Sequence, residues 1–213
     1  ELLPGYTDYR FRVQCQSYDV TERLCQGKNV IAAVVGDGWY RGGLGAGSKR
    51  NGYGAKTGFM CCLSITYEDG KTECVVSDDT VKVMQEGPLR ENDLKIDEIY
   101  DARREAELGD WTSPEYDDSG WANATPMTYG GRVILQEGEP ILRQEIFTPE
   151  ILHTPDGATV LDFGQNIAGY IEFTVTAKEG QEVFLRFGEM LDENGEFTQK
   201  NIQCSNKKIT TPL

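Results

Sequence analysis

Residues 36–42 combine, within seven positions, the side-chain types that proteins use to bind carbohydrates. The segment contains Asp37, Trp39, Tyr40 and Arg41 between glycines. Aromatic faces stack on the C–H patches of a sugar ring, while a carboxylate and a guanidinium can hydrogen-bond its hydroxyl groups. The carboxylate could instead hold a calcium ion that binds the hydroxyls. The alternative is structural, with Trp39 filling the core and Asp37 opening a turn.

A second candidate lies at residues 100–103, where Asp101 and Arg103 are two positions apart. If this segment is a strand, both side chains lie on the same face of the sheet. They could then grip neighbouring sugar hydroxyls, or they could pair with each other as a structural ion pair. Both alternatives remain open at this point.

The run between Trp111 and Trp121 contains three acids, Glu115, Asp117 and Asp118. Calcium requires several oxygen ligands, but this run lacks the alternating acids followed by glycine of an EF-hand loop. We therefore expect the two tryptophans to fix a loop against the fold. The sequence assigns no particular residue as a metal ligand.

The sequence contains no recognisable catalytic constellation. Glycosidases need two carboxylates on opposite sides of the scissile bond, and the 35 acids always supply candidates by chance. Glu189 and Asp192 are best explained as the polar tip of a hairpin, and His153 as a loop residue.

The six cysteines include no Cys-x-x-Cys pair, so a zinc site is not expected. They are predicted to be reduced and structural in a cytoplasmic protein, with a secreted, disulfide-bonded protein as the alternative. These residues are Cys15, Cys25, Cys61, Cys62, Cys74 and Cys204.

The elements that must position these residues are mostly strands. Residues 10–16 alternate between apolar and polar, and residues 29–35 form a continuous apolar run that predicts a central strand. A short helical turn is expected between them, after Asp19. Residues 42–58 contain seven glycines and predict a long mobile loop. Residues 59–67 and 72–77 flank an Asp-Gly turn and predict a hairpin, followed by a short strand at 80–84.

A second series of strands is expected from about residue 141, with strands at 141–147, 171–176 and 183–187 and a turn at Asn194. The stretch between the strand at 80–84 and about residue 124 is predicted to be polar and irregular. With little helical periodicity, the fold class is all-β. We place a domain boundary near residues 130–140, which gives domains at 1–135 and 136–213.

Composition excludes several functions. The net charge is −14, and residues 59–213 carry 13 basic against 30 acidic side chains, so nucleic acid is not an expected partner. No apolar run reaches the roughly 18 residues of a membrane span, so no membrane partner is expected either. Because the chain starts at Glu1 without a signal-peptide pattern, we expect a piece of a longer protein.

Several motifs, in this order, resemble the amino-terminal region of bacterial α-L-rhamnosidases. They are Tyr18-Asp-Val-Thr21, Asn29-Val-Ile31, Gly36-Asp-Gly-Trp-Tyr-Arg-Gly42, Tyr100-Asp-Ala-Arg103, Tyr116-Asp-Asp-Ser-Gly-Trp121, Val160-Leu-Asp-Phe-Gly-Gln-Asn166 and Leu185-Arg-Phe-Gly-Glu189. The resemblance implies a jelly-roll sandwich like galactose-binding domains, followed by part of a second β-sandwich. In the family, an (α/α)6 barrel beyond these domains carries the inverting acid and base.

By this resemblance the chain is a non-catalytic accessory region that braces the barrel and can bind L-rhamnose-containing glycans. The alternative is a stand-alone, calcium-dependent, lectin-like module. No cofactor is expected for catalysis, whereas calcium is a candidate for sugar binding. The family has an extra pair of strands before residues 3–9, and without them an open sheet edge would favour a homodimer.

Overall fold

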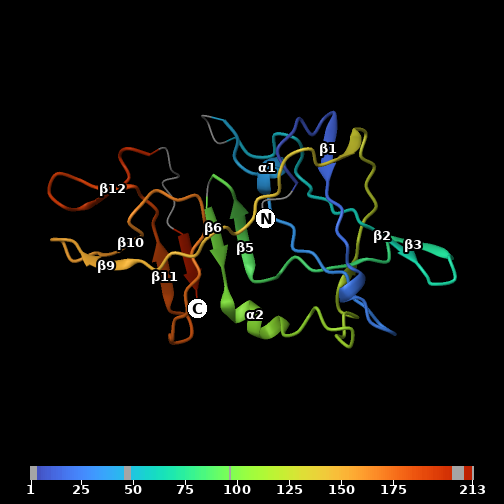
Figure 1. The fold of residues 1–213 in the computed structure, drawn as a ribbon. Helices are drawn as coiled ribbons and strands as arrows, with labels where there is room; N and C mark the ends of the chain where they lie inside the picture. The colour runs from blue at the N-terminus through green and yellow to red at the C-terminus, as the bar shows by residue number, and fades with distance from the viewer. Residues whose placement is uncertain (1–3, 46–48, 96, 203–208, 213) are drawn as a thin grey trace.

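The computed structural model describes residues 4–45, 49–95, 97–202 and 209–212. Its strands and helices are distributed along the whole chain (Figure 1). The strands are β1 (Arg12–Cys15), β2 (Cys62–Thr66), β3 (Thr72–Val76), β4 (Lys82–Val83), β5 (Leu89–Asp93), β6 (Asp97–Tyr100), β7 (Ala122–Asn123), β8 (Arg132–Leu135), β9 (Glu150–His153), β10 (Thr159–Asp162), β11 (Glu182–Leu185), β12 (Met190–Leu191), β13 (Phe197–Thr198) and β14 (Ile209–Pro212). The helical segments are the 3₁₀ turn η1 (Thr21–Arg23), α1 (Gly38–Arg41) and α2 (Ala102–Leu108).

A four-stranded sheet with the order β11-β14-β6-β5 positions both candidate sites. β5 and β6 form an antiparallel hairpin, and β14 pairs parallel with β6 and antiparallel with β11. Helix α1 packs against β5, while α2 starts directly after β6 (Figure 1). The sheet therefore joins early and late segments of the chain.

The other described strands form two-stranded sheets. β1 pairs parallel with β8, β2 with β3, β4 with β7, β9 with β10 and β12 with β13. The predicted strands near residues 10–16 and 80–84 are confirmed, as are the turn after Asp19 and the Asp-Gly hairpin. A hairpin also encloses Asn194, with Gly195 at φ 77°. The all-β class is confirmed, whereas the jelly-roll topology, the domain boundary and the homodimer stay predictions.

Several sequence-based predictions are wrong. Residues 29–35, 141–147 and 171–176 contain no strand, although each has a strand-like pattern. A strand needs a ladder of backbone hydrogen bonds to a neighbouring strand, and within the described residues none of these segments belongs to a sheet. The predicted strand at 183–187 is shorter, because β11 ends at Leu185. Residues 89–108 are not irregular, since they form β5, β6 and α2.

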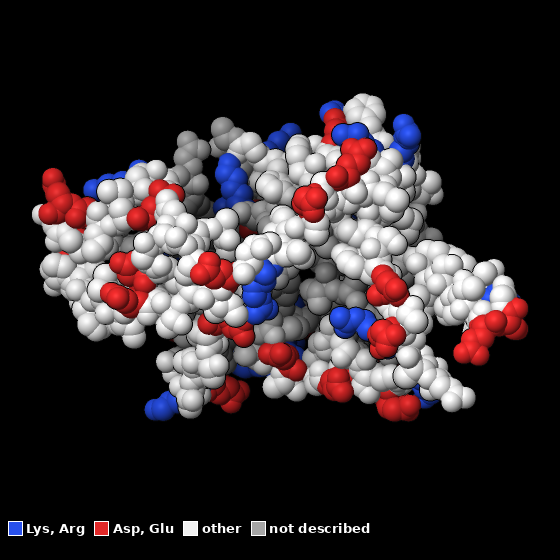
Figure 2. All heavy atoms as spheres, in the orientation of Figure 1, with Lys and Arg blue, Asp and Glu red and all other residues white. Residues whose placement is uncertain are grey.

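Little of the described chain is buried. Among the described positions, Tyr9 is the one large hydrophobic residue that is buried, at 5% exposure. The total accessible surface is 16495 Å². Figure 2 shows acidic side chains spread over the visible face, with basic ones between them, rather than gathered into one patch. Within the described ranges, no helix has the length and apolar character needed to cross a bilayer.

Candidate functional site

Helix α1 holds the first group of candidate residues at the end of β5. The backbone N–H of Asp37 donates to the carbonyl of Asn92 at 3.0 Å, and the N–H of Arg41 donates to the carbonyl of Asp37 at 2.9 Å. Gly38 has φ 49°, in the left-handed region, where glycine carries no Cβ penalty. Residues 38–41 therefore form a single helical turn.

Two carboxylates and two guanidiniums form an ionic network beside α1. Asp37 accepts a hydrogen bond from Arg50 and lies 3.4 Å from the Nη1 of Arg41. The Asp93 side chain is only 2% exposed; it accepts the N–H of Gly43 at 2.7 Å and lies 3.8 Å from Arg50 Nε. A buried carboxylate needs such partners to stay charged. The network fixes Arg50, and so anchors part of the glycine-rich loop.

Five aromatic side chains form a cluster next to this network, which we call the aromatic cluster. Tyr9 lies at its centre, with ring centroids 6.0 Å from Tyr6, 5.7 Å from Tyr40 and 5.1 Å from Tyr53. Tyr6 also contacts Trp39, at 5.6 Å. Tyr6 is 55% exposed and Trp39 is 37% exposed. The cluster thus presents open aromatic surface on a packed base, as a sugar-binding platform requires.

Two hydroxyl groups of the cluster, those of Tyr9 and Tyr53, stay neutral well into the alkaline range. Burial raises the pKa of Tyr9 to about 12. The hydrogen bond between the Tyr6 and Tyr53 hydroxyls, 2.9 Å long, raises the pKa of Tyr53 to about 12. Each neutral phenol can both donate and accept a hydrogen bond.

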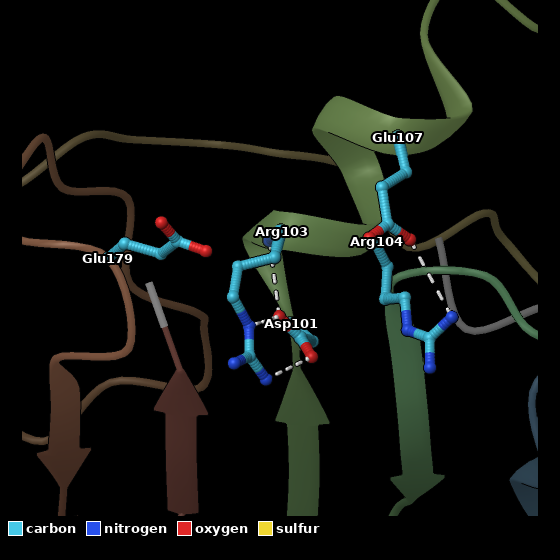
Figure 3. A pocket seen from close by; sticks show the side chains of 5 residues that line it. All are labelled: Asp101, Arg103, Arg104, Glu107 and Glu179. Atoms are coloured by element: carbon cyan, nitrogen blue, oxygen red, sulfur yellow. Dashed lines mark hydrogen bonds and ion pairs between the residues drawn. The ribbon is translucent and has the colours of Figure 1, made fainter.

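The second group, Asp101 and Arg103, lines a polar pocket of about 310 Å³ (Figure 3). Asp101 follows β6 and caps α2 by accepting the N–H of Arg103 at 3.1 Å. Arg103 also donates through its side chain to both oxygens of Asp101, at 2.9 and 2.8 Å. These bonds lower the pKa of Asp101 to about 2. Residues 101–103 are therefore not a strand but a helix start, and the two side chains form an ion pair with each other.

The other walls of the pocket are charged side chains from two segments. Arg104 and Glu107 lie on α2, where their side chains are 3.6 Å apart, and Glu179 comes from the turn before β11 (Figure 3). The pocket has no aromatic face among these residues, so it lacks the stacking surface that a sugar ring prefers.

The two groups lie at opposite ends of the β5–β6 hairpin. Asp37 bonds to Asn92 at one end, while the N–H of Asp101 donates to the carbonyl of Pro88 at 2.8 Å at the other. Five residues of strand separate these ends by roughly 13–16 Å. The structure therefore does not bring the six predicted residues into one site.

Sequence reasoning missed Tyr6, Tyr9, Tyr53 and Arg50. Tyr6 and Tyr9 lie far from residues 36–42 in sequence, while Arg50 and Tyr53 lie in the glycine-rich loop that follows them. A lone tyrosine or arginine in a loop carries no local signal for such a contact. Asp8 was missed too; it pairs with Arg10 at 2.5 Å, which lowers the pKa of Asp8.

The remaining candidates have structural partners. Asp192 accepts the N–H groups of Asn194 and Glu196 at the β12–β13 turn, as a hairpin tip predicts. His153 is the last residue of β9, not a loop residue.

The acid-rich run between the tryptophans is also partnered. Glu115 pairs with Lys28 at 3.1 Å. Trp111 and Trp121 pack against each other with centroids 6.2 Å apart. Across the described residues, no group of three or more His, Cys, Asp or Glu side chains could hold a metal ion.

Known proteins share both the sequence and the fold of this chain. Residues 1–145 match the α-L-rhamnosidase N-terminal domain, and residues 152–211 match the bacterial α-L-rhamnosidase concanavalin-like domain. The chain is 34% identical over 208 residues to an α-L-rhamnosidase from Streptomyces avermitilis, covering 96% of this chain and 20% of that protein. It is 32% identical over 207 residues to one from an Alteromonas species, covering 96% of this chain and 22% of the relative.

The crystal structure of native α-L-rhamnosidase from Aspergillus terreus matches with a TM-score of 0.85 and 30% identity, over 99% of this chain and 24% of that one. The chain thus spans about a fifth of the length of the relatives that it matches. The resemblance predicted from the motifs is confirmed.

Proposed function

The chain belongs to the α-L-rhamnosidase N-terminal domain family, and from this premise we propose that it is a non-catalytic accessory region that braces the catalytic part of a longer α-L-rhamnosidase. In this proposal the longer enzyme releases terminal α-L-rhamnosyl groups with catalytic residues that lie outside the chain. The chain supplies a surface against which the catalytic part packs.

The observation that carries this proposal is the exposed apolar surface. A compact monomer of 23.8 kDa exposes about 9,900 Å². This chain exposes 16495 Å², and many large apolar side chains are exposed, for example Val34 at 67% and Ile146 at 75%. Exposed apolar surface on this scale marks a site of contact with another protein surface. In the longer enzyme, further domains of the same polypeptide would cover these apolar side chains.

The experiment places a charge on this surface in the full-length protein that carries the sequence. If Ile146 is covered there, Ile146→Glu loses at least the roughly 1.5–3 kcal/mol of burying an isoleucine side chain, and it also buries a charge. We expect a melting midpoint lower by several degrees and slower hydrolysis of an aryl α-L-rhamnoside. Gln144→Glu, an exposed polar position two residues away, is the matched control. Equal behaviour of the two variants would contradict bracing.

A second function is supported by the aromatic cluster. We propose that the exposed faces of Tyr6 and Trp39 bind L-rhamnose, with the hydroxyls of Tyr6 and Tyr53 hydrogen-bonding the sugar. The support is geometric: the exposed rings of Tyr6 and Trp39 are in contact at 5.6 Å, and Tyr6 packs in turn on the buried ring of Tyr9. As a lectin-like site it would be independent of the catalytic part.

Calcium fits this site poorly. Three carboxylates next to residues of the cluster or its ionic network each form an ion pair with a guanidinium: Asp8 with Arg10, Asp37 with Arg50, and Asp93 with Arg50. A calcium site requires several carboxylate or carbonyl oxygens that are not already neutralised in this way. We therefore derive no calcium-dependent step, and we keep calcium as one condition of the experiment.

Thermal melts test sugar binding, because a ligand that binds only the folded state raises the midpoint. The chain is melted with L-rhamnose or with a second hexose, each with calcium and with a chelator. We expect a rise with L-rhamnose that Trp39→Ala abolishes and that Tyr18→Ala, at a tyrosine outside the cluster, retains. A rise that survives Trp39→Ala would exclude the cluster as the site.

A further inference from the structure

The hairpin β2–β3 carries two cysteines on one face. Its register places Cys62 opposite Val76, and Ser64 opposite Cys74, so the two cysteines are diagonal neighbours. Because side chains alternate along a strand, residues two apart share a face. Both cysteines are exposed, and their Sγ atoms are 2.7 Å apart. Figure 1 shows the hairpin projecting from the rest of the fold, so solvent reagents can reach it.

We propose that Cys62 and Cys74 form a disulfide across this hairpin when the protein meets an oxidising thiol–disulfide couple. A disulfide has an S–S distance of about 2.05 Å, so the sulfurs must approach by only about 0.7 Å. Cys61 is not the partner, because it is adjacent to Cys62 and its side chain lies on the opposite face of the strand. Its backbone N–H donates to the Ser77 hydroxyl at 3.1 Å, which fixes the start of the strand.

The chemistry balances with an external disulfide as oxidant, for example oxidised glutathione. The Cys62 thiolate attacks one sulfur of the external disulfide; a mixed disulfide forms and one small thiol leaves. The Cys74 thiolate then attacks the Cys62 sulfur and releases the second small thiol. Two protein thiols are oxidised and one external disulfide is reduced. The contact with Cys62 raises the pKa of the Cys74 thiol, so a smaller fraction of Cys74 is thiolate than for an unperturbed cysteine.

The disulfide would control the stability of the hairpin. Within the described residues, β2 and β3 pair only with each other, and an isolated two-stranded hairpin is marginally stable. Joining residues 62 and 74 closes a loop of about 13 residues, for which the chain-entropy estimate corresponds to an about 100-fold lower population of the open hairpin. Oxidation would therefore keep the β2–β3 hairpin closed, whereas the reduced hairpin can open.

The test equilibrates the full-length protein in glutathione buffers of increasing oxidised fraction, blocks free thiols with N-ethylmaleimide, and maps the peptides by mass spectrometry. We expect the peptides containing Cys62 and Cys74 to become linked together at one midpoint. Cys61→Ser is the matched control and keeps the link. Cys74→Ser loses it and accumulates glutathione on Cys62.

Hydrogen exchange of the hairpin amides gives a second measurement. It should slow by about 100-fold on oxidation of the wild type and stay unchanged in Cys62→Ser. The proposal is overturned if both thiols remain alkylated in the most oxidising buffer, if glutathione stays on both as separate mixed disulfides, or if Cys61 replaces Cys62 in the linked peptide.

Discussion

Tyr9 supports the aromatic cluster from below, and replacing it with alanine tests whether the cluster is a packed unit. Its ring is 5% exposed and contacts the rings of Tyr6, Tyr40 and Tyr53. Truncating a buried aromatic side chain costs about 3–5 kcal/mol, which includes about 0.5–1.5 kcal/mol for each ring pair. For a chain of this size that corresponds to a melting midpoint lower by roughly 10 °C.

Urea unfolding followed by fluorescence measures this loss, with two variants as controls. Tyr9→Phe keeps the ring and removes only the 3.3 Å hydrogen bond to the Gly5 carbonyl, which is worth about 1 kcal/mol or less. Tyr18→Ala removes a tyrosine that is 65% exposed, so its effect should stay within about 0.5 kcal/mol. If Tyr9→Ala is no more destabilising than Tyr18→Ala, the cluster is not a packed unit and the reasoning fails.

Three further predictions concern the raised tyrosine pKa values, the lowered Asp101 pKa and the close packing around Gly42. The pKa values of Tyr9 and Tyr53 are raised to about 12, so the stability that these groups contribute is full below about pH 10 and is lost as the pH rises through 12. Absorbance titration should show both tyrosines ionising well above the ordinary tyrosine range near pH 10, and ionisation within that range would contradict this. The pKa of Asp101 is lowered to about 2, so the pH dependence is reversed: the stability that this carboxylate contributes to the fold is present above about pH 4 and is lost as the pH falls through 2. Asp101→Asn should remove this acid dependence and speed amide exchange in α2. A Cβ at Gly42 would meet the Gly38 carbonyl and the Asp93 carboxylate, so Gly42→Ala should cost about 1–3 kcal/mol in chemical unfolding, whereas Gly120→Ala, with open space around it, should be close to neutral.

Local signals predicted local structure correctly. The Asp-Gly turn between β2 and β3 and the Asn194 turn between β12 and β13 are fixed by residues that are adjacent in sequence. Helix α2 also had such a signal, which we missed. Asp101 is an N-cap, Gly109 ends the helix at φ 65°, and the residues between them are good helix formers.

Long-range structure could not be predicted in this way. Residues 29–35 and 171–176 have strand patterns, but pattern alone does not say where a partner strand lies. The candidate site shows the same limit. Trp39 and Tyr40 were identified from their neighbours in sequence, whereas Tyr6 and Tyr53 reach them only through the fold.

Hydrogen exchange in the full-length protein tests the bracing role most directly. Amides in residues 29–35 and 142–147, which belong to no strand in the described part of the chain, are compared between the full-length protein and the chain of 213 residues. Bracing predicts that these amides are protected in the full-length protein and exchange fast in the shorter chain. Equal, fast exchange in both would mean that nothing covers this surface, and would contradict the proposed role.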